Sequence, residues 1–274
     1  MLACHLHGTL KYYTAPHFDG VRHAFSTRQG GVSLPPFDTL NLGRAGEDPR
    51  ANILQNFERL CGAIKVDMRR LVFARQVHGD TVRRVTAADA GEGLYRPATA
   101  DCDALVTNDP GVCLTVFSAD CVPILLYDPE KQAVGAVHAG WRGTALGIVR
   151  KTVETLGDRY GCRTAHLRAA VGPCIGPCCF ETRADVAKAL AGVLGASVAP
   201  YIRYDGGDRF HIDLREINIF WLTQAGVPRA QIELSEACTH CRVEDFFSYR
   251  RDGARHGSMA AFIQLNPPLE GSPR

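Results

Sequence analysis

Residues 100–149 read ADCDALVTNDPGVCLTVFSADCVPILLYDPEKQAVGAVHAGWRGTALGIV, and this stretch decides the fold. Its apolar runs are short and are separated by turns that contain Pro, Gly or Asp, which is the pattern of successive β-strands. We predict strands at residues 101–107, 112–117, 122–127 and 133–138. The segment AGWRGT (residues 139–144) then turns the chain into an apolar helix that starts near Ala145.

Polar side chains follow these predicted strands at the points where they end. Asp120 and Cys121 come after the second strand, and His138 and Arg142 lie at the end of the fourth. Because a rigid sheet presents the residues at its strand ends to a pocket, we expect the chemistry of the protein here.

The rest of the chain continues to alternate strand and helix patterns. Further strands are predicted at residues 10–14, 21–26, 70–76, 81–85, 167–171, 210–214, 232–235 and 260–265. Helices are predicted at residues 48–61, 147–160, 182–194 and 214–225. With no repeat and no linker, the chain is expected to form one domain over residues 1–266, followed by a disordered tail at residues 267–274.

Composition and charge argue against several classes of protein. Of the 274 residues, 46% are apolar and 22% are charged, which is typical of a globular domain. A net charge of +2 gives no indication of a nucleic acid or membrane partner. The first residues lack the features of a signal peptide, and no apolar run reaches the roughly 18 residues of a membrane-spanning helix. We therefore expect a cytoplasmic protein.

The eleven cysteines favour free thiols and metal ligands over disulfides, because no export signal precedes them. Cys238 and Cys241 have the two-residue spacing of half a zinc knuckle. Their available partners are Cys174 with Cys178 or Cys179, whose spacing is irregular. Buried thiols are therefore a better interpretation of these residues than a second, structural zinc site.

His78, Cys121 and His138 each follow an apolar, strand-like run and lie next to small residues. Two imidazoles and one thiolate leave a fourth tetrahedral position of a zinc ion open, as in catalytic sites. The same residues are also compatible with core histidines beside a buried thiol. A further alternative is a Cys–His nucleophilic pair, which excludes bound zinc because a coordinated thiolate is a poor nucleophile. The spacing leaves all three interpretations open.

Three arginines are candidates for holding an anion. Arg142 lies between two glycines at the predicted start of a helix, a combination that suits phosphate. Arg28 precedes a Gly-Gly pair in a polar loop at residues 27–41, and Arg250 lies in SYRRDG (residues 248–253). A helix cap, an exposed connector and a surface turn are the respective alternatives. Neither a P-loop nor a dinucleotide-binding fingerprint occurs in the sequence.

Several short motifs occur in order along the chain. They are FSTRQGGVS (residues 25–33), QVHG (76–79), ADCDA (100–104), SADCVPI (118–124), VHAGWRG (137–143), GPCIG (172–176) and FSYRR (247–251). Through this set the chain resembles, over about residues 20–265, the laccase-domain family, also called the multicopper polyphenol oxidase family or YfiH-type purine nucleoside phosphorylases. The resemblance implies an α+β fold, in which a single domain of mixed β-sheets is covered by helices in the layer order α/β/β/α.

The same resemblance implies one zinc ion bound by the His of QVHG, the Cys of SADC and the His of VHAGWRG, which are His78, Cys121 and His138 here. It implies phosphorolysis of adenosine, inosine, guanosine and methylthioadenosine, together with adenosine deamination. The partners are then purine nucleosides and phosphate, and the protein is a monomer or a weak homodimer. For this chemistry we expect Asp120 to orient a water or a ligand, and Arg142 and Arg28 to hold phosphate.

Other activities are associated with the same family. Some bacterial members are linked to editing of peptidoglycan precursors, which would make this chain a Cys-dependent or zinc hydrolase. The older name implies oxidation of phenols by copper, and this interpretation is disfavoured. A laccase needs several coppers on clustered histidines, whereas the ten histidines here are scattered and form one HxH pair, His5 and His7. A non-catalytic metal-binding module is the remaining alternative, suggested by the many thiols.

Overall fold

The apolar runs of residues 101–138 form strands whose side chains are almost wholly buried. These strands are β6 (Ala104–Thr107), β7 (Cys113–Ser118), β8 (Val122–Asp128) and β9 (Ala133–Ala139), close to the predicted ranges. Strands that are buried on both faces belong to a layered core, which explains their nearly continuous apolar sequence. The computed structural model describes residues 1–43 and 47–267.

Within these residues the longer strands form two six-stranded sheets. The first sheet has the order β1-β2-β3-β15-β7-β4, with β1 (Ala3–His7), β2 (Leu10–Thr14), β3 (Val21–Ser26), β15 (Met259–Leu265) and β4 (Leu71–Phe73). The second has the order β14-β10-β8-β9-β6-β5, with β14 (Ile232–Leu234), β10 (Arg168–Val171) and β5 (Val82–Arg84). Both sheets are mixed, because β4 pairs with β7, β5 with β6 and β14 with β10 in parallel, while the other pairs are antiparallel.

The two sheets pack face to face through an apolar layer. Leu114 of β7 and Ile263 of β15 come from the first sheet, and Leu125 of β8 comes from the second. All three side chains are fully buried. Removal of this apolar surface from water is the main stabilising contribution at the centre of the molecule.

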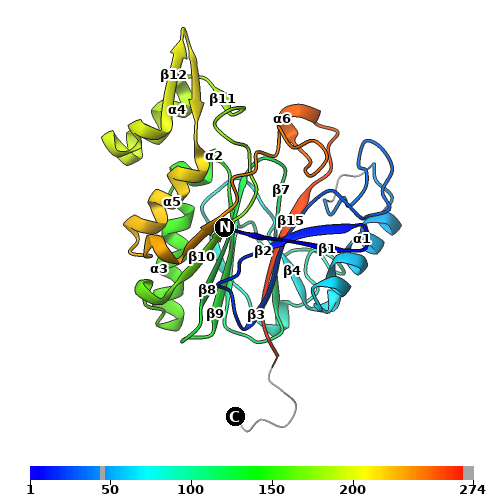
Figure 1. The fold of residues 1–274 in the computed structure, drawn as a ribbon. Coiled ribbons are helices and arrows are strands. Elements are labelled where there is room, and N and C mark those ends of the chain that lie inside the picture. The colour runs from blue at the N-terminus through cyan, green and yellow to red at the C-terminus, as the bar shows by residue number, and fades with distance from the viewer. Residues whose placement is uncertain (44–46, 268–274) are drawn as a thin grey trace.

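Helices cover the outer faces of both sheets (Figure 1). α1 (Arg50–Ala63) packs on the first sheet through Phe57, whose ring stacks on that of Phe73 with centroids 5.2 Å apart. α3 (Ile148–Tyr160) and α5 (Leu214–Gln224) cover the second sheet. The layer order α/β/β/α confirms the expected α+β fold of a single domain.

A small third sheet lies at one end of this sandwich, at the top of Figure 1. It consists of β11 (Glu181–Thr182), β13 (Arg209–Ile212) and β12 (Ile202–Gly206), and α4 (Ala184–Leu194) packs beside it. α4 and β13 confirm the helix and the strand predicted in this region. β12 is an additional strand, and its mostly exposed, polar sequence lacks the apolar alternation that would predict it.

The helix expected from Ala145 differs from the observed one. It begins earlier, as the short α2 (Trp141–Ala145), and α3 starts only after Gly147. Gly147 has φ of +74°, a left-handed conformation that separates the two helices and that glycine adopts without steric cost. The break separates α2, which follows β9 directly, from α3.

The strand expected at residues 70–76 is also shorter than predicted, since β4 ends at Phe73. Beyond Phe73, the side chain of Gln76 makes hydrogen bonds to the neighbouring strand β7. Its amide nitrogen donates to the carbonyl of Phe117 at 2.8 Å, and its oxygen accepts from the N–H of Phe117 at 2.7 Å. This leaves the backbone of residues 77–79 free to turn away from the first sheet.

No helix in the described ranges is long and apolar enough to cross a membrane. Of the tail predicted to be disordered, residues 268–274 lie outside the described residues.

Phe57→Ala is expected to lower the free energy of unfolding by about 3–5 kcal/mol, because it removes an aromatic ring from full burial between α1 and the first sheet. Chemical denaturation measures the change. Glu58→Ala, at the next and exposed position of the same helix, is the control, and its effect should stay within about 0.5 kcal/mol. Equal stabilities of the two variants would contradict the packing of α1 described above.

Candidate active site

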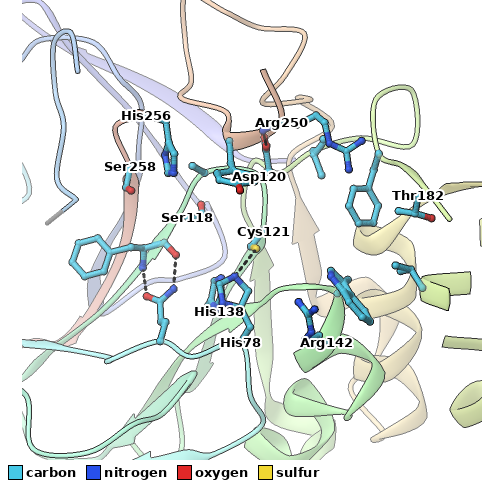
Figure 2. A pocket seen from close by; sticks show the side chains of 18 of the residues that line it. His78, Ser118, Asp120, Cys121, His138, Arg142, Thr182, Arg250, His256 and Ser258 are labelled. Carbon is cyan, nitrogen blue, oxygen red and sulfur yellow. Dashed lines mark hydrogen bonds between the residues drawn. The ribbon is translucent and has the colours of Figure 1, made fainter. Parts of the chain in front are cut away.

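The side chains of His78, Cys121 and His138 meet at one point (Figure 2). Their ligand atoms all lie within 4.8 Å of one another. The ring centroids of His78 and His138 are 4.9 Å apart with the planes nearly perpendicular, and Cys121 Sγ lies 3.9 Å from His78 Nε2. The structure thus brings together the three residues that the sequence suggested as metal ligands.

Strand ends and turns place each of these side chains. His138 lies in β9, and Cys121 lies in the short link through which the chain passes from β7 in the first sheet to β8 in the second. His78 lies in the turn between β4 and β5. His78 and Asp120, the residue before Cys121, have φ values of +61° and +98°. Such values are uncommon outside glycine, so both turns depend on tertiary contacts that hold them.

Asp103 provides these contacts for the turn that carries His78. Its carboxylate is fully buried and accepts the backbone N–H groups of Val77, His78 and Gly79 at 3.2, 3.0 and 2.7 Å. The same carboxylate lies 2.8 Å from Nδ1 of His138. Burial opposes ionisation of Asp103, but the His138 ring and the backbone N–H groups outweigh it and hold its pKa below the usual value. One carboxylate therefore orients both imidazoles.

The donor set fits a metal ion such as zinc. Because Nδ1 of His138 faces Asp103, Nε2 is the ring nitrogen left for a ligand. A Cβ atom at Gly140 would lie 2.9 Å from His78 Cδ2 and 3.2 Å from Cys121 Sγ, so glycine is needed where the backbone passes the three side chains. Two imidazoles and one thiolate are common zinc donors, and a set of three leaves a position for substrate.

Cys121 ionises readily in this environment. Burial raises the pKa of its thiol, but the adjacent His138 and hydrogen bonds with both imidazoles lower it, to about 6 overall. The thiolate is the form that binds metals and also the form that attacks electrophiles. The electrostatics are thus compatible with both the metal-ligand and the nucleophile interpretation of Cys121.

A cavity of about 800 Å³ opens beside these three residues, a size typical of small-molecule sites. Its walls are rich in aromatic side chains, which are Phe117, Trp141, Phe180 and Tyr249. Its polar lining includes Gln76, Ser118, Thr182, His256 and Ser258, and Figure 2 shows several of these side chains around the metal-ligand group. A cavity with flat apolar walls and a few polar groups suits a heteroaromatic ligand.

Asp120 lines the cavity but is fully engaged within the protein. It accepts hydrogen bonds from Thr239 Oγ1 at 2.6 Å, from Ser248 Oγ at 3.0 Å and from the backbone N–H of Arg250 at 2.7 Å. The structure therefore places Asp120 where it ties the segment around residues 239–250 to the strand link that carries Cys121.

The candidate arginines lie in different places. Arg142 lines the cavity, with its guanidinium 4.3 Å from the centroid of the Trp141 ring. Arg250 also lines it, and its guanidinium donates to the carbonyl of Glu181 at 2.7 Å. Arg250 thus contacts β11 of the small third sheet.

Arg28 lies outside the cavity lining. Its guanidinium donates to the carbonyls of Asp38 and Val243 at 2.7 and 3.2 Å and packs 4.6 Å from the centroid of the Phe247 ring. These contacts use the charge of Arg28 to hold the loop at residues 27–41, so the structure does not bring it together with the other predicted site residues.

Sequence reasoning assigned no role to Asp103, Gln76 or the aromatic walls of the cavity. For Asp103 a signal was present, because an acidic residue at the start of a wholly apolar strand must find hydrogen-bond partners once buried. The aromatic residues come from segments far apart in the chain, and no local pattern connects them.

Asp103→Asn is expected to weaken zinc binding by about 10- to 100-fold. The amide has one acceptor oxygen, so it cannot accept all the hydrogen bonds by which the carboxylate orients His138 and the turn of His78. Competition with a chromophoric chelator measures the affinity. Asp101→Asn, at an exposed position two residues earlier, should bind zinc as the unchanged protein does. If both variants kept the original affinity, Asp103 would not be the residue that orients the two histidines.

The chain is similar in sequence to characterised proteins along most of its length. The family model described as multi-copper polyphenol oxidoreductase laccase matches residues 22–266. Purine nucleoside phosphorylase YlmD from Geobacillus stearothermophilus is 39% identical over 251 residues, covering 91% of this chain and 92% of that protein. Purine nucleoside phosphorylase YfiH from Escherichia coli is 37% identical over 250 residues, covering 91% and 96%.

Solved structures show the same fold. The crystal structure of YlmD from Geobacillus stearothermophilus superposes with a TM-score of 0.92 at 35% identity and covers 97% of this chain and 100% of that one. The crystal structure of the Bacillus licheniformis hypothetical protein YfiH gives 0.92 at 35% identity, with coverage of 96% and 99%. The chain therefore belongs to the multi-copper polyphenol oxidoreductase laccase family.

Proposed function

We propose that this protein is a zinc-dependent purine nucleoside phosphorylase that also deaminates adenosine. The observation that carries the proposal is the meeting of His78, Cys121 and His138 along one wall of an aromatic cavity. The names of two relatives, both purine nucleoside phosphorylases at 39% and 37% identity, support it. The substrates we propose are adenosine, inosine, guanosine and methylthioadenosine, with phosphate as the second reactant.

Zinc bound by His78, Cys121 and His138 would supply a Lewis acid that polarises a substrate oxygen or acidifies water. The residues of the chain do the positioning. Asp103 accepts the Nδ1 proton of His138 and so fixes the ring nitrogen that faces the site. The thiolate of Cys121 offsets part of the charge of the cation.

The purine base would stack against the aromatic walls formed by Trp141, Phe180 and Tyr249. Stacking recognises any purine, which accords with a broad set of nucleosides. Thr182 and His256 lie in the same lining and would supply hydrogen-bonding groups for the base or the sugar.

In phosphorolysis the bond between C1′ and the base nitrogen breaks while a phosphate oxygen bonds to C1′, and positive charge develops on the ribose. We assign phosphate to Arg142, with Arg250 as a second cation in the lining of the same cavity. Asp120 is a positioning residue in this proposal, because its hydrogen bonds hold Ser248 and the backbone of Arg250. Arg28 positions the loop at residues 27–41 instead of binding phosphate.

A hydrolase in which Cys121 is the nucleophile and His138 its base is the second candidate, and editing of a peptidoglycan precursor would be its reaction. The pKa of about 6 for the thiol favours it, since the thiolate is present at neutral pH. Alkylation of Cys121 in metal-free protein separates the candidates, because it stops only an enzyme that works without zinc.

A copper oxidase stays disfavoured, since the other group of potential metal ligands among the described residues contains no histidine.

Incubation with adenosine and phosphate is expected to give adenine and ribose 1-phosphate by phosphorolysis, and inosine and ammonia by deamination. His78→Ala and Cys121→Ala should lose the zinc of this site and both activities, because each removes one of only three protein ligands. Chromatography of the products and elemental analysis measure the two effects. His7→Ala and Cys4→Ala, both exposed on β1, are the matched controls. Full turnover by a metal-free variant would refute zinc-dependent catalysis.

Arg142→Ala is expected to raise KM for phosphate by about 10- to 100-fold, because a hydrogen bond to a charged group contributes about 1.5–3 kcal/mol. Steady-state kinetics at varied phosphate measures the change, while deamination of adenosine, which uses no phosphate, should change far less. Arg69→Ala, at an exposed arginine outside the cavity lining, serves as control. An unchanged KM for phosphate in Arg142→Ala would contradict the assignment.

A further inference from the structure

Four cysteine side chains form a second cluster, apart from the site described above. Cys178 and Cys179 lie in the segment after β10, and Cys238 and Cys241 lie in the segment between β14 and α6 (Tyr249–Asp252). Their sulfur atoms all lie within 4.8 Å of one another. We propose that these four thiolates bind a second zinc ion, which has a structural role and joins the two segments.

The sulfur positions match a tetrahedral four-thiolate site. Zinc–sulfur bonds of about 2.3 Å place the sulfur atoms of a tetrahedron about 3.8 Å apart. The Cys241 sulfur lies 3.7 Å from that of Cys178 and 3.3 Å from that of Cys179. These separations exceed by far the roughly 2.05 Å of a disulfide bond.

The backbone of both segments turns in a way that aims the thiols at one point. Residues 238–241 close a turn in which the N–H of Arg242 donates to the carbonyl of Cys238 at 3.0 Å. In the facing segment, the N–H of Cys179 donates to the carbonyl of Gly176 at 3.0 Å. The N–H of Gly176 also donates to the sulfur of Cys238 at 3.2 Å, a contact that stabilises a metal-bound thiolate.

The identity of the ion follows from the donors. Thiolates in a tetrahedral arrangement select zinc or iron among the common metals, and a closed set of four cysteines that leaves no position for substrate is the form of a structural zinc site. Cys238 is buried, Cys179 is half-buried, and Cys178 and Cys241 are exposed, so the cluster lies at the surface where an ion can enter. Cys174, which the spacing suggested as a partner, does not belong to the group.

Both of these segments carry residues that line the cavity or hold its lining in place. Thr239 donates to Asp120 at 2.6 Å, and Arg250 donates to the carbonyl of Cys179 at 3.2 Å. Ile175 and Phe180 flank Cys178 and Cys179 and line the cavity. A zinc ion at the four cysteines would therefore hold the wall of the cavity that carries Arg250 and Phe180, without contact with the substrate.

Elemental analysis of the purified protein tests the proposal by counting zinc per chain. We expect two zinc ions in the unchanged protein, one in His78→Ala and one in the double variant C178S/C241S. Cys4→Ser, at an exposed cysteine of β1, is the control and should keep two. An equal zinc count in the unchanged protein and in C178S/C241S would overturn the proposal, whereas an equal count in the unchanged protein and in His78→Ala would overturn zinc binding at the catalytic site. Because each variant empties one site, failure of this proposal is distinguishable from failure of the catalytic site.

Cobalt substitution provides a second test that does not depend on the folding of C178S/C241S. In His78→Ala loaded with cobalt, the four thiolates should give intense sulfur-to-cobalt charge-transfer absorption, and a spectrum without it would refute the site.

Peptide mapping under non-reducing conditions adds a further check on the unchanged protein. In the protein as purified, denatured in the presence of an alkylating agent, all four cysteines are expected to be free thiols, whereas a disulfide between Cys241 and Cys178 or Cys179 would contradict zinc binding.

Discussion

The buried carboxylate of Asp103 is the interaction on which the candidate site depends. A negative charge without contact with water is costly unless it is fully hydrogen-bonded, and here three backbone N–H groups and an imidazole satisfy it. The N–H groups belong to the turn of His78, and the imidazole is that of His138. The requirement to satisfy one charge thus fixes two ligands from separate parts of the chain. Because His78 has a positive φ, the turn would lose its shape without these bonds.

The position of the site follows from how the sheets are connected. β7 belongs to the first sheet and β8 to the second, and only a few residues join them. The chain must therefore bend sharply at Asp120, whose φ of +98° is held by hydrogen bonds from the segment around residues 239–250. Cys121 follows directly and points toward His78, in the link from β4 of the first sheet to β5 of the second, and toward His138 in β9 (Figure 2). A two-sheet sandwich with short crossings thus concentrates reactive side chains at one end.

The two clusters of potential ligands differ in a way that suits different tasks. Two imidazoles and a thiolate leave room for a substrate, and they lie beside a cavity lined by Trp141 and Phe180. The four thiols supply, in our proposal, a complete tetrahedral set, and they lie in segments that also carry Ile175 and Phe180 of the cavity lining. In our proposals the first cluster performs the chemistry, while the second limits the motion of the segments that carry Arg250 and the partners of Asp120.

The sequence by itself determined the local structure and the kinds of residue at the site. Continuous apolar runs predicted β6 to β9, and the order of the motifs indicated the family and the set His78, Cys121 and His138. The tertiary structure decided which sheet each strand joins, that Asp103 orients both histidines, and that Arg28 lies outside the cavity. It also decided that the thiols of Cys178 and Cys179, and not that of Cys174, gather with the thiols of Cys238 and Cys241. The reason is physical: apolar periodicity reports contacts within a helix or strand, whereas contacts between distant segments depend on how the whole chain packs.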